Sequence, residues 1–347
     1  MLKRLKRGAL RTMKQLGVYR VCGDSAWRQR RLLILCYHGI SLDDEHQWDP
    51  QFYMSPSDFE QRLGLLAAGG YTVLPLGNAL DQLYAGTLAP RSVCLTFDDG
   101  LFDFQERAMP LLERFGFPAT VYLTTYYSDF NRPVFNPFVQ YVMWKSGRGV
   151  VNASSLFGSE AIWDLSSAPG RHAALVTLLR YAREHDMSAA GKDALAARVA
   201  ALLGVDYDAL VDRRVLHLLT ADEVAKLAAR GVDFQLHTHR HCNPRDREGL
   251  AREIIDNRRR IKEILGTSPV DFCYPSGVCR EGYPVWLADL GVRSATTARA
   301  ALASPESHIM MLPRVVDSTS LDAVEFEGWL TGVSAAIPQR RWHVEVD

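Results

Sequence analysis

The sequence has no net charge, because its 347 residues contain 40 Lys and Arg against 40 Asp and Glu. A protein that binds nucleic acid through its overall field is normally basic, so we expect no nucleic-acid partner. Long apolar runs are also missing, since basic residues separate the leucines near the N-terminus. We therefore expect no signal peptide and no transmembrane helix. The expected location is cytoplasmic, with peripheral contact at the inner face of the membrane left open.

Cysteine is scarce and is not arranged for metal binding. The chain contains no C-x-x-C pair and no zinc-finger spacing. Without an export signal, cysteines are expected to stay as reduced thiols. This interpretation applies to all six: Cys22, Cys36, Cys94, Cys242, Cys273 and Cys279.

Charge is concentrated at one end of the chain. Residues 1–31 hold ten Lys or Arg and the single acidic residue Asp24. Apolar residues recur between them at helical spacing, which predicts an amphipathic helix. That helix could lie on an anionic membrane surface through residues 2–17, or it could dock on the body of the protein. The apolar stripe consists of Leu2, Leu5, Ala9, Met13 and Leu16.

The rest of the chain alternates short β-branched runs with amphipathic segments, which favours a parallel sheet covered by helices. About eight such strands suggest a closed or nearly closed barrel. The predicted strands are 32–37, 71–74, 92–97, 119–124, 232–236, 270–274, 292–297 and 311–316. The predicted helices are 57–68, 103–115, 220–230, 245–265 and 280–290, and Thr220 with Glu223 has the pattern of a capping box.

One connection is too long for a barrel crossover. Roughly 90 residues separate the strand ending at 124 from the helix beginning at Thr220. We therefore predict an inserted, mostly helical subdomain over 126–218. The flanking segments 31–125 and 219–317 would form the two parts of the barrel. Residues 1–30 would be the basic N-terminal segment, and 318–347 a C-terminal helix and tail.

Two adjacent carboxylates end a predicted buried strand in "VCLTFDDGLFDF" (93–104). Asp98 and Asp99 would repel each other there, and a cation or a shared proton relieves that cost. The alternative is a solvated loop in which Asp99 or Asp103 caps the next helix.

Two histidines follow another predicted strand in "HTHRHCNP" (237–244). His237 and His241 are four residues apart, so one helical turn or a tight loop could direct both imidazoles at one metal ion. Histidine-rich surface turns give the same pattern. In a parallel barrel, however, all carboxyl ends of strands open on one face. One aspartate and two histidines would make three protein ligands, which is typical of a catalytic metal site.

These motifs carry a family resemblance. "TFDDG" (96–100), "H-T-x-x-H" (237–241) and "FCYPSG" (272–277), in this order, resemble the polysaccharide deacetylase family, also called carbohydrate esterase family four or the NodB-homology domain. "LCYHGIS" (35–41) and "SPSDFEQRLGLLAAGGY" (55–71) resemble the opening of its longer bacterial members. The resemblance covers about residues 30–125 and 220–316.

The resemblance implies a distorted, TIM-like (β/α) barrel of about seven to eight parallel strands. It also implies removal of N-acetyl or O-acetyl groups from a polysaccharide, an oligosaccharide or a lipid-linked sugar. It implies that Asp98 is the general base and that Asp99, His237 and His241 bind a divalent metal. Zinc is the usual ion, with Co²⁺, Ni²⁺ or Mn²⁺ as other choices. The backbone N–H of Ser276 would hold the oxyanion.

The sequence departs from the family pattern at two positions. Cys273 stands where the family usually has an arginine that orients the base. Arg314 stands where the family usually has a histidine that acts as the acid on the departing amine. Because barrel closure would bring the ends of the first and last strands together, we expect His38 to be the general acid and Arg314 to steady Asp98. A core histidine bonded to backbone is the alternative for His38, and simple packing is the expected role of Cys273 and Cys279. Weaker candidates for the acid are His239 and His308.

Two other functions compete with this one. The chain could hydrolyse a small non-sugar amide, or it could be an inactive glycan-binding homologue. The four intact residues of the first two motifs oppose the inactive form. Aromatic residues of the insertion favour a sugar but could equally form a core: Phe135, Phe138, Tyr141 and Trp144.

Overall fold

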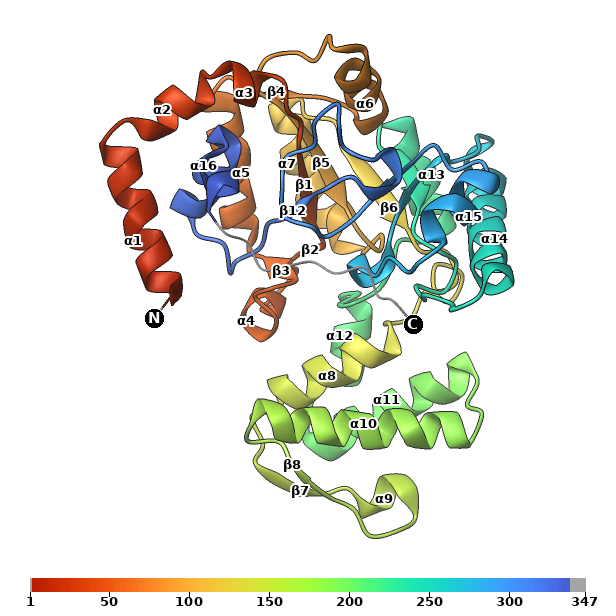
Figure 1. The fold of residues 1–347 in the computed structure, drawn as a ribbon. Helices are drawn as coiled ribbons and strands as arrows, with labels where there is room; N and C mark the ends of the chain where they lie inside the picture. The colour runs from red at the N-terminus through yellow and green to blue at the C-terminus, as the bar shows by residue number, and fades with distance from the viewer. Residues whose placement is uncertain (1, 338–347) are drawn as a thin grey trace.

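The computed structural model describes residues 2–337, with only the backbone for residues 2–5. Its main sheet is entirely parallel and runs in the order β11-β10-β9-β6-β5-β1-β12, with β4 paired to β5. This curled sheet confirms the predicted parallel α/β fold (Figure 1). The strands are β1 (Leu33–Tyr37), β4 (Thr72–Val73), β5 (Ser92–Phe97), β6 (Thr120–Leu123), β9 (Asp233–Leu236), β10 (Asp271–Cys273), β11 (Ser294–Thr296) and β12 (Val315–Val316).

The two edges of the sheet are joined by an isolated parallel bridge between Thr296 and Leu312. The amide of Thr297 also donates to the carbonyl of Leu312 at 2.8 Å. Only 315–316 of the predicted strand 311–316 is regular, and Ile309–Met311 forms a short 3₁₀ helix instead. Pro313 contributes to this difference because it has no amide hydrogen for a strand ladder.

Helices surround the sheet. They are α5 (Pro56–Ala68), α6 (Leu76–Ala85), α7 (Met109–Phe115), α13 (Ala221–Ala229), α14 (Arg247–Leu265) and α15 (Tyr283–Asp289). The helix over 76–85 was not predicted, and the others lie close to the predicted positions. The predicted helix 103–115 begins instead as a π-helical turn, Phe104–Ala108. Pro110 explains the change, since it cannot donate to the carbonyl four residues earlier. Two short strands, β2 (Gly39–Ile40) and β3 (Tyr53–Met54), flank α4 (Glu45–Trp48).

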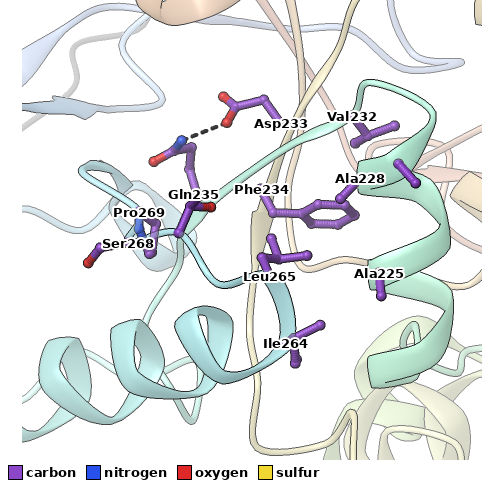
Figure 2. Close-up of a pocket in the computed structure, with 12 residues that line it drawn as sticks. Ala225, Ala228, Val232, Asp233, Phe234, Gln235, Ile264, Leu265, Ser268 and Pro269 are labelled. Atoms are coloured by element: carbon purple, nitrogen blue, oxygen red, sulfur yellow. Dashed lines mark hydrogen bonds between the residues drawn. The ribbon is translucent and has the colours of Figure 1, made fainter.

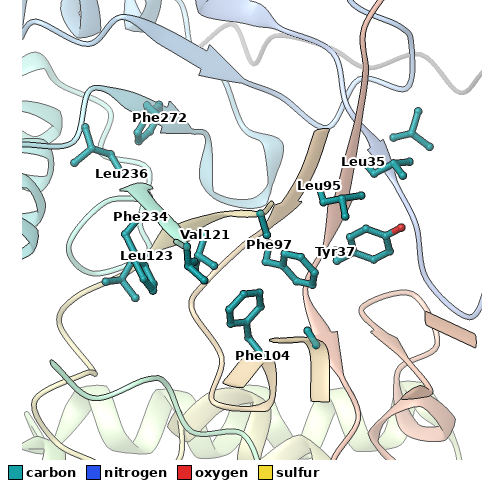
Figure 3. Close-up of a cluster of buried hydrophobic side chains, with 14 of the residues drawn as sticks. Leu35, Tyr37, Leu95, Phe97, Phe104, Val121, Leu123, Phe234, Leu236 and Phe272 are labelled. Carbon is teal, nitrogen blue, oxygen red and sulfur yellow. The ribbon is translucent and has the colours of Figure 1, made fainter. Parts of the chain in front are cut away.

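The strands place alternate side chains on opposite faces of the sheet. One set packs toward the helices and forms the largest core, part of which Figure 3 shows: Leu35, Tyr37, Leu95, Phe97, Val121, Leu123, Phe234, Leu236 and Phe272. The other set is also buried and includes Ile34, Cys94, Tyr122 and Cys273. This second face supplies the side chains beneath the site described below.

Segment 126–218 forms a separate layer beside the barrel (Figure 1). It contains α8 (Phe135–Lys145), β7 (Val150–Asn152), α9 (Ser154–Phe157), β8 (Ile162–Asp164), α10 (Ala168–Glu184), α11 (Ala189–Leu203) and α12 (Tyr207–Asp212). The antiparallel β7–β8 hairpin was not predicted. Phe138 and Tyr141 are fully buried in a core shared with α10 and α11, so these two rings are structural.

The N-terminal helix docks on the protein itself. α1 (Leu2–Gln15) packs on α16 (Ala323–Thr331), where Arg7 pairs with Glu325 at 3.1 Å and Lys14 pairs with Glu327 at 2.6 Å. Leu10 is completely buried in this contact, whereas Ala9 and Leu16 of the predicted apolar stripe are exposed. The side chains of Leu2 and Leu5 lie outside the described set. α2 (Val18–Gly23) and α3 (Ala26–Gln29) continue the segment.

The described residues contain no helix that is long and apolar enough to cross a membrane. Beyond α16 a 3₁₀ turn spans Val333–Ala336. The predicted C-terminal tail lies mostly in 338–347, outside the described residues. The boundaries proposed for the five segments of the chain stay predictions.

Candidate active site

The polar residues singled out in the sequence gather at the carboxyl end of the sheet. Asp98 and Asp99 follow β5, His237 follows β9, and His38 follows β1. Arg314 differs from expectation, because it lies just before β12 rather than near that strand's end. The register of β12 with β1 begins at Val315 and Leu35, so Arg314 starts below the level of Leu35, three residues before the end of β1 at Tyr37. Its long side chain reaches the site from the barrel interior.

Three candidate metal ligands converge on one point. His237 Nε2 and His241 Nε2 each lie 3.2 Å from Asp99 Oδ1. The ligand atoms of all three residues lie within 4.8 Å of one another. A tetrahedral ion with bonds of about 2.0–2.1 Å would separate its ligands by roughly 3.3 Å. The two measured distances therefore suit a zinc-sized ion.

Neighbouring groups fix the orientation of the first histidine. His237 Nδ1 lies 2.9 Å from the carbonyl oxygen of Cys273, so this nitrogen carries the hydrogen and Nε2 is left to bind metal. The buried amide of Asn257 accepts from the backbone N–H of His237 at 3.0 Å. Within residues 2–337, Asp99 Oδ1 is buried without a hydrogen-bond partner. An orphaned carboxylate oxygen facing two imidazole nitrogens fits a bound cation.

The backbone is strained at the same place. Four non-glycine residues of the three motifs have positive φ: Asp99 at 72°, Thr238 at 61°, His241 at 52° and Ser276 at 55°. Such conformations cost free energy and cluster at functional sites. The histidines are therefore presented by a tight loop and not by a helical turn. Ser276 lies exposed in the 3₁₀ turn Pro275–Gly277, which follows β10 at the same edge.

Asp98 is held by a two-point ion pair with Arg314. Arg314 Nη1 donates to Oδ1 and Nη2 to Oδ2, each at 2.7 Å, and both residues are buried. Burial by itself would raise the pKa of Asp98, but the guanidinium outweighs it and holds the pKa well below the usual value. The carboxylate is therefore charged across the physiological range. Asp103, the alternative capping residue, makes no side-chain cap.

His38 lies close to the ion pair of Asp98 and Arg314. Its Nε2 is 3.9 Å from Asp98 Oδ2, and its ring packs at 4.5 Å on the ring of Phe52. Its Nδ1 is buried and accepts or donates no hydrogen bond within the described chain. The backbone-bonded core histidine considered from the sequence is thus not observed. His239 instead contacts Thr125, and His308 caps a 3₁₀ turn.

Sequence reasoning missed two neighbours of Asp98 and one support of His237. Cys36 Sγ and Cys273 Sγ lie 3.5 and 3.4 Å from Asp98 Oδ2, so Cys273 contacts the site and does more than fill space. The sequence does contain a signal for Cys36. Side chains alternate between the two faces of a strand, so Cys36 points to the face opposite to that of Leu35 and Tyr37. The sequence also contains a signal for Asn257, because this polar residue occupies one position of the otherwise apolar buried stripe of α14 named next. That stripe is Leu250, Ile254, Asn257 and Ile261.

A cleft of about 410 Å³ opens beside the metal-ligand cluster. Asp99 and His241 line one side, and the start of α8 lines the other with Asn136 and Gln140. A different cavity, of about 450 Å³, lies where β9 begins, between α13 and α14 (Figure 2). Asp233 and Gln235 hydrogen-bond there at 2.7 Å, at the opposite end of the strand from His237.

Comparison with known proteins identifies the fold and the family. A deacetylase from Streptococcus pyogenes, PplD in complex with acetate, has a similar structure with a TM-score of 0.57 and 17% identity, covering 86% of this chain and 98% of its own. IcaB from Ammonifex degensii matches with a TM-score of 0.54 and 16% identity, covering 87% and 97% of the two chains. A polysaccharide deacetylase from Bacillus cereus has a TM-score of 0.54 and 15% identity, covering 87% and 69%.

No curated protein matches the chain by sequence. The family model described as polysaccharide deacetylase matches residues 85–145 and 176–295, more than half of the chain. The matched segments include the strand that ends at Asp98 and Asp99 and the loop that carries His237 and His241. The chain therefore belongs to the polysaccharide deacetylase family, whose members are metal-dependent hydrolases of acetyl amide bonds.

Proposed function

We propose that the protein removes N-acetyl, or O-acetyl, groups from a glycan or a lipid-linked sugar, with a divalent metal held by Asp99, His237 and His241. The observation that carries this proposal is the convergence of those three ligands beside a charged Asp98. Acetate, which is bound in the similar structure of PplD, would be a product of this reaction.

Zinc suits the donor set best, because two imidazoles and one carboxylate leave a tetrahedral ion one open position. Bound there, the ion would lower the pKa of a coordinated water and polarise the acetyl carbonyl. Co²⁺, Ni²⁺ and Mn²⁺ stay alternatives, since the same donors accept them.

Asp98 is the residue that we assign as the general base. It lies next to Asp99 in the chain, and Arg314, which also donates to Thr96, holds both oxygens of its carboxylate. Arg314 is thus a positioning residue that acts through Asp98. It would take over the task that an arginine at position 273 performs in the family pattern.

His38 is the group we assign as general acid. Its Nε2 lies near Asp98, and its ring is fixed against Phe52, at the edge of the cleft. A protonated imidazole there could donate to a departing amine. The backbone N–H of Ser276 would stabilise the oxyanion from the turn after β10, at the same edge of the sheet.

Acetate release tests the proposal. Purified protein loaded with zinc should release acetate from N-acetylated oligosaccharides or lipid-linked sugars, and a chelator should stop the release. His241→Ala should lose both metal and activity, whereas His38→Ala should keep its metal and lose turnover. Full activity after complete metal removal would refute the metal-dependent mechanism. Wild-type turnover in His38→Ala would refute the assigned acid.

The two competing functions give different results in the same assay. Hydrolysis of small amides without activity on sugars would support the non-sugar alternative. Sugar binding without any hydrolysis would support the inactive homologue.

We also propose that the N-terminal segment contacts anionic membranes from the cytoplasmic side. Supporting this, Leu16 and Val21 are 74% and 73% exposed although they are apolar. Basic side chains that are exposed around them would add attraction to an anionic surface: Arg11, Arg20 and Arg30.

A further inference from the structure

Two cavities meet at Tyr127. The first is the cleft beside the metal ligands, here called the metal-side cleft. The second, called the outer groove, has a volume of about 500 Å³ and lies between residues 126–135 and the start of α11. Tyr127 lines both, and the segment 133–137 contributes to both. Both volumes fall in the range of ligand sites.

Aromatic rings line the outer groove. Tyr126, Phe130 and Phe135 all contribute to its wall, and Phe130 is 44% exposed. The rings of Tyr126 and Phe130 are 5.8 Å apart, and Tyr126 also packs edge-on against Tyr127. Flat apolar rings offer stacking surfaces for the apolar faces of pyranose sugars.

The rim of the groove is polar, and two of its charged side chains are paired with each other. Arg132 Nε lies 3.2 Å from Asp193, and the hydroxyl of Tyr207 donates to the same carboxylate. Ser188 and Lys192 add further polar groups. Paired charges and hydroxyls suit the hydroxyl groups of a sugar, whereas a lipid tail would have to desolvate them.

The metal-side cleft has the same character. Trp48 and Phe52 provide rings, while Asn136 and Gln140 provide amides one turn apart on α8. Its one cation, Arg240, is already paired with Glu253 at 2.8 Å. The carboxylates of Asp49 and Asp99 also line the cleft, so the lining disfavours an anionic sugar.

We propose that the two cavities form one track for a glycan chain. The metal-side cleft holds the acetylated sugar, and the outer groove holds its neighbours in the same chain. The inserted subdomain is then the part of the protein that selects a polymeric substrate over a lipid-linked monosaccharide. This inference rests on the proposed deacetylase function.

Binding as a function of chain length tests the track. The probes are N-acetylglucosamine oligomers of one to six units, in β-1,4 and β-1,6 linkage. The full-length Asp98→Asn variant loaded with zinc would bind them without turnover, and calorimetry would give each Kd. We expect the Kd to fall by roughly tenfold or more between one and four units in at least one series. Equal affinity at all lengths, or no binding in either series, would overturn the track.

Three further variants locate the effect. Phe130→Ala, in the outer groove, should remove most of the affinity gained between short and long oligomers. Gln140→Ala, in the metal-side cleft, should weaken binding at every length. Tyr84→Ala on α6 is the matched control, since Tyr84 is 38% exposed and lines neither cavity. The same loss in Tyr84→Ala and Phe130→Ala would contradict the proposal.

Two separate readouts distinguish the failure of the track from the failure of the proposed function. Chelator-sensitive hydrolysis of p-nitrophenyl acetate reports on the metal centre alone. If it persists while chain length has no effect, the function stands and the track is wrong. If it is absent while long oligomers still bind best, the track stands and the function is wrong.

A lipid-like probe tests the other occupant of the outer groove. If an octyl glycoside of N-acetylglucosamine binds as tightly as the tetramer, and Phe130→Ala removes the affinity that the octyl chain adds, the groove is a lipid site and the track is wrong.

Discussion

At the scale of single residues, Asp98 and Asp99 have adjacent positions but opposite surroundings. Asp98 faces Arg314 inside the barrel, whereas Asp99 faces two imidazoles. Asp98→Asn should therefore lower turnover by about 10²–10⁴-fold while metal stays bound, since an amide cannot accept the proton. Asp99→Asn should lose the metal. Elemental analysis and acetate release measure both, and metal loss confined to Asp98→Asn would reverse the assignment.

His217 makes stability depend on pH. It is buried, its imidazole Nδ1 donates to the carbonyl of Val215 at 3.1 Å, and burial lowers its pKa to about 4. The neutral form is favoured in the folded state, so stability is complete above the unfolded pKa of about 6.5 and falls as pH drops toward 4. We expect this histidine alone to remove about 2 kcal/mol of unfolding free energy between pH 7 and pH 5.

Urea titrations at the two pH values measure that difference. His217→Gln should lack this part of the pH dependence. His172→Gln, at an exposed histidine of α10, is the control and should keep it. An unchanged pH dependence in His217→Gln would show that other groups cause it.

At the scale of elements, α1 is held to α16 by one buried leucine and a set of ion pairs. Ion pairs whose basic partner is open to solvent contribute little, as for Lys14 with Glu327 and Arg7 with Glu325, so Leu10 should dominate the docking. Leu10→Ala should cost about 2–5 kcal/mol locally and release the helix. Hydrogen exchange should then accelerate in α1 but not in the sheet. Leu16→Ala, at an exposed position of the same segment, should change neither the stability of the docked helix nor the hydrogen exchange of α1. Equal exchange in the two variants would contradict this account.

At the scale of the whole molecule, the outward side of the N-terminal segment should decide membrane association. Vesicles containing phosphatidylglycerol should bind the protein, and vesicles of phosphatidylcholine should bind it weakly. Raising salt should release it, because exposed charges are screened within about 8–10 Å at physiological ionic strength. Leu16→Asp combined with Val21→Asp should reduce sedimentation with the vesicles. Vesicle binding that survives this change would show that the N-terminal segment only packs against the body of the protein.

The sequence by itself determined the parts that depend on neighbouring residues. Strand and helix positions followed from local periodicity, and the capping box of Thr220 and Glu223 formed as predicted. The motifs of Asp99, His237 and His241 also indicated a common site, because parallel strand ends share one face.

Only the tertiary structure decided which distant groups meet there. Arg314 pairs with Asp98 across 216 residues, and it does so from inside the barrel because closure places β12 beside β1. The helical periodicity of α1 could not select its buried side, since that depends on how Leu10 and the basic side chains fit the surface of α16. The composition of the inserted segment 126–218 also could not show that its helix α8 lines the metal-side cleft. Local propensity acts over a few residues, whereas these contacts exist only once the whole chain has packed.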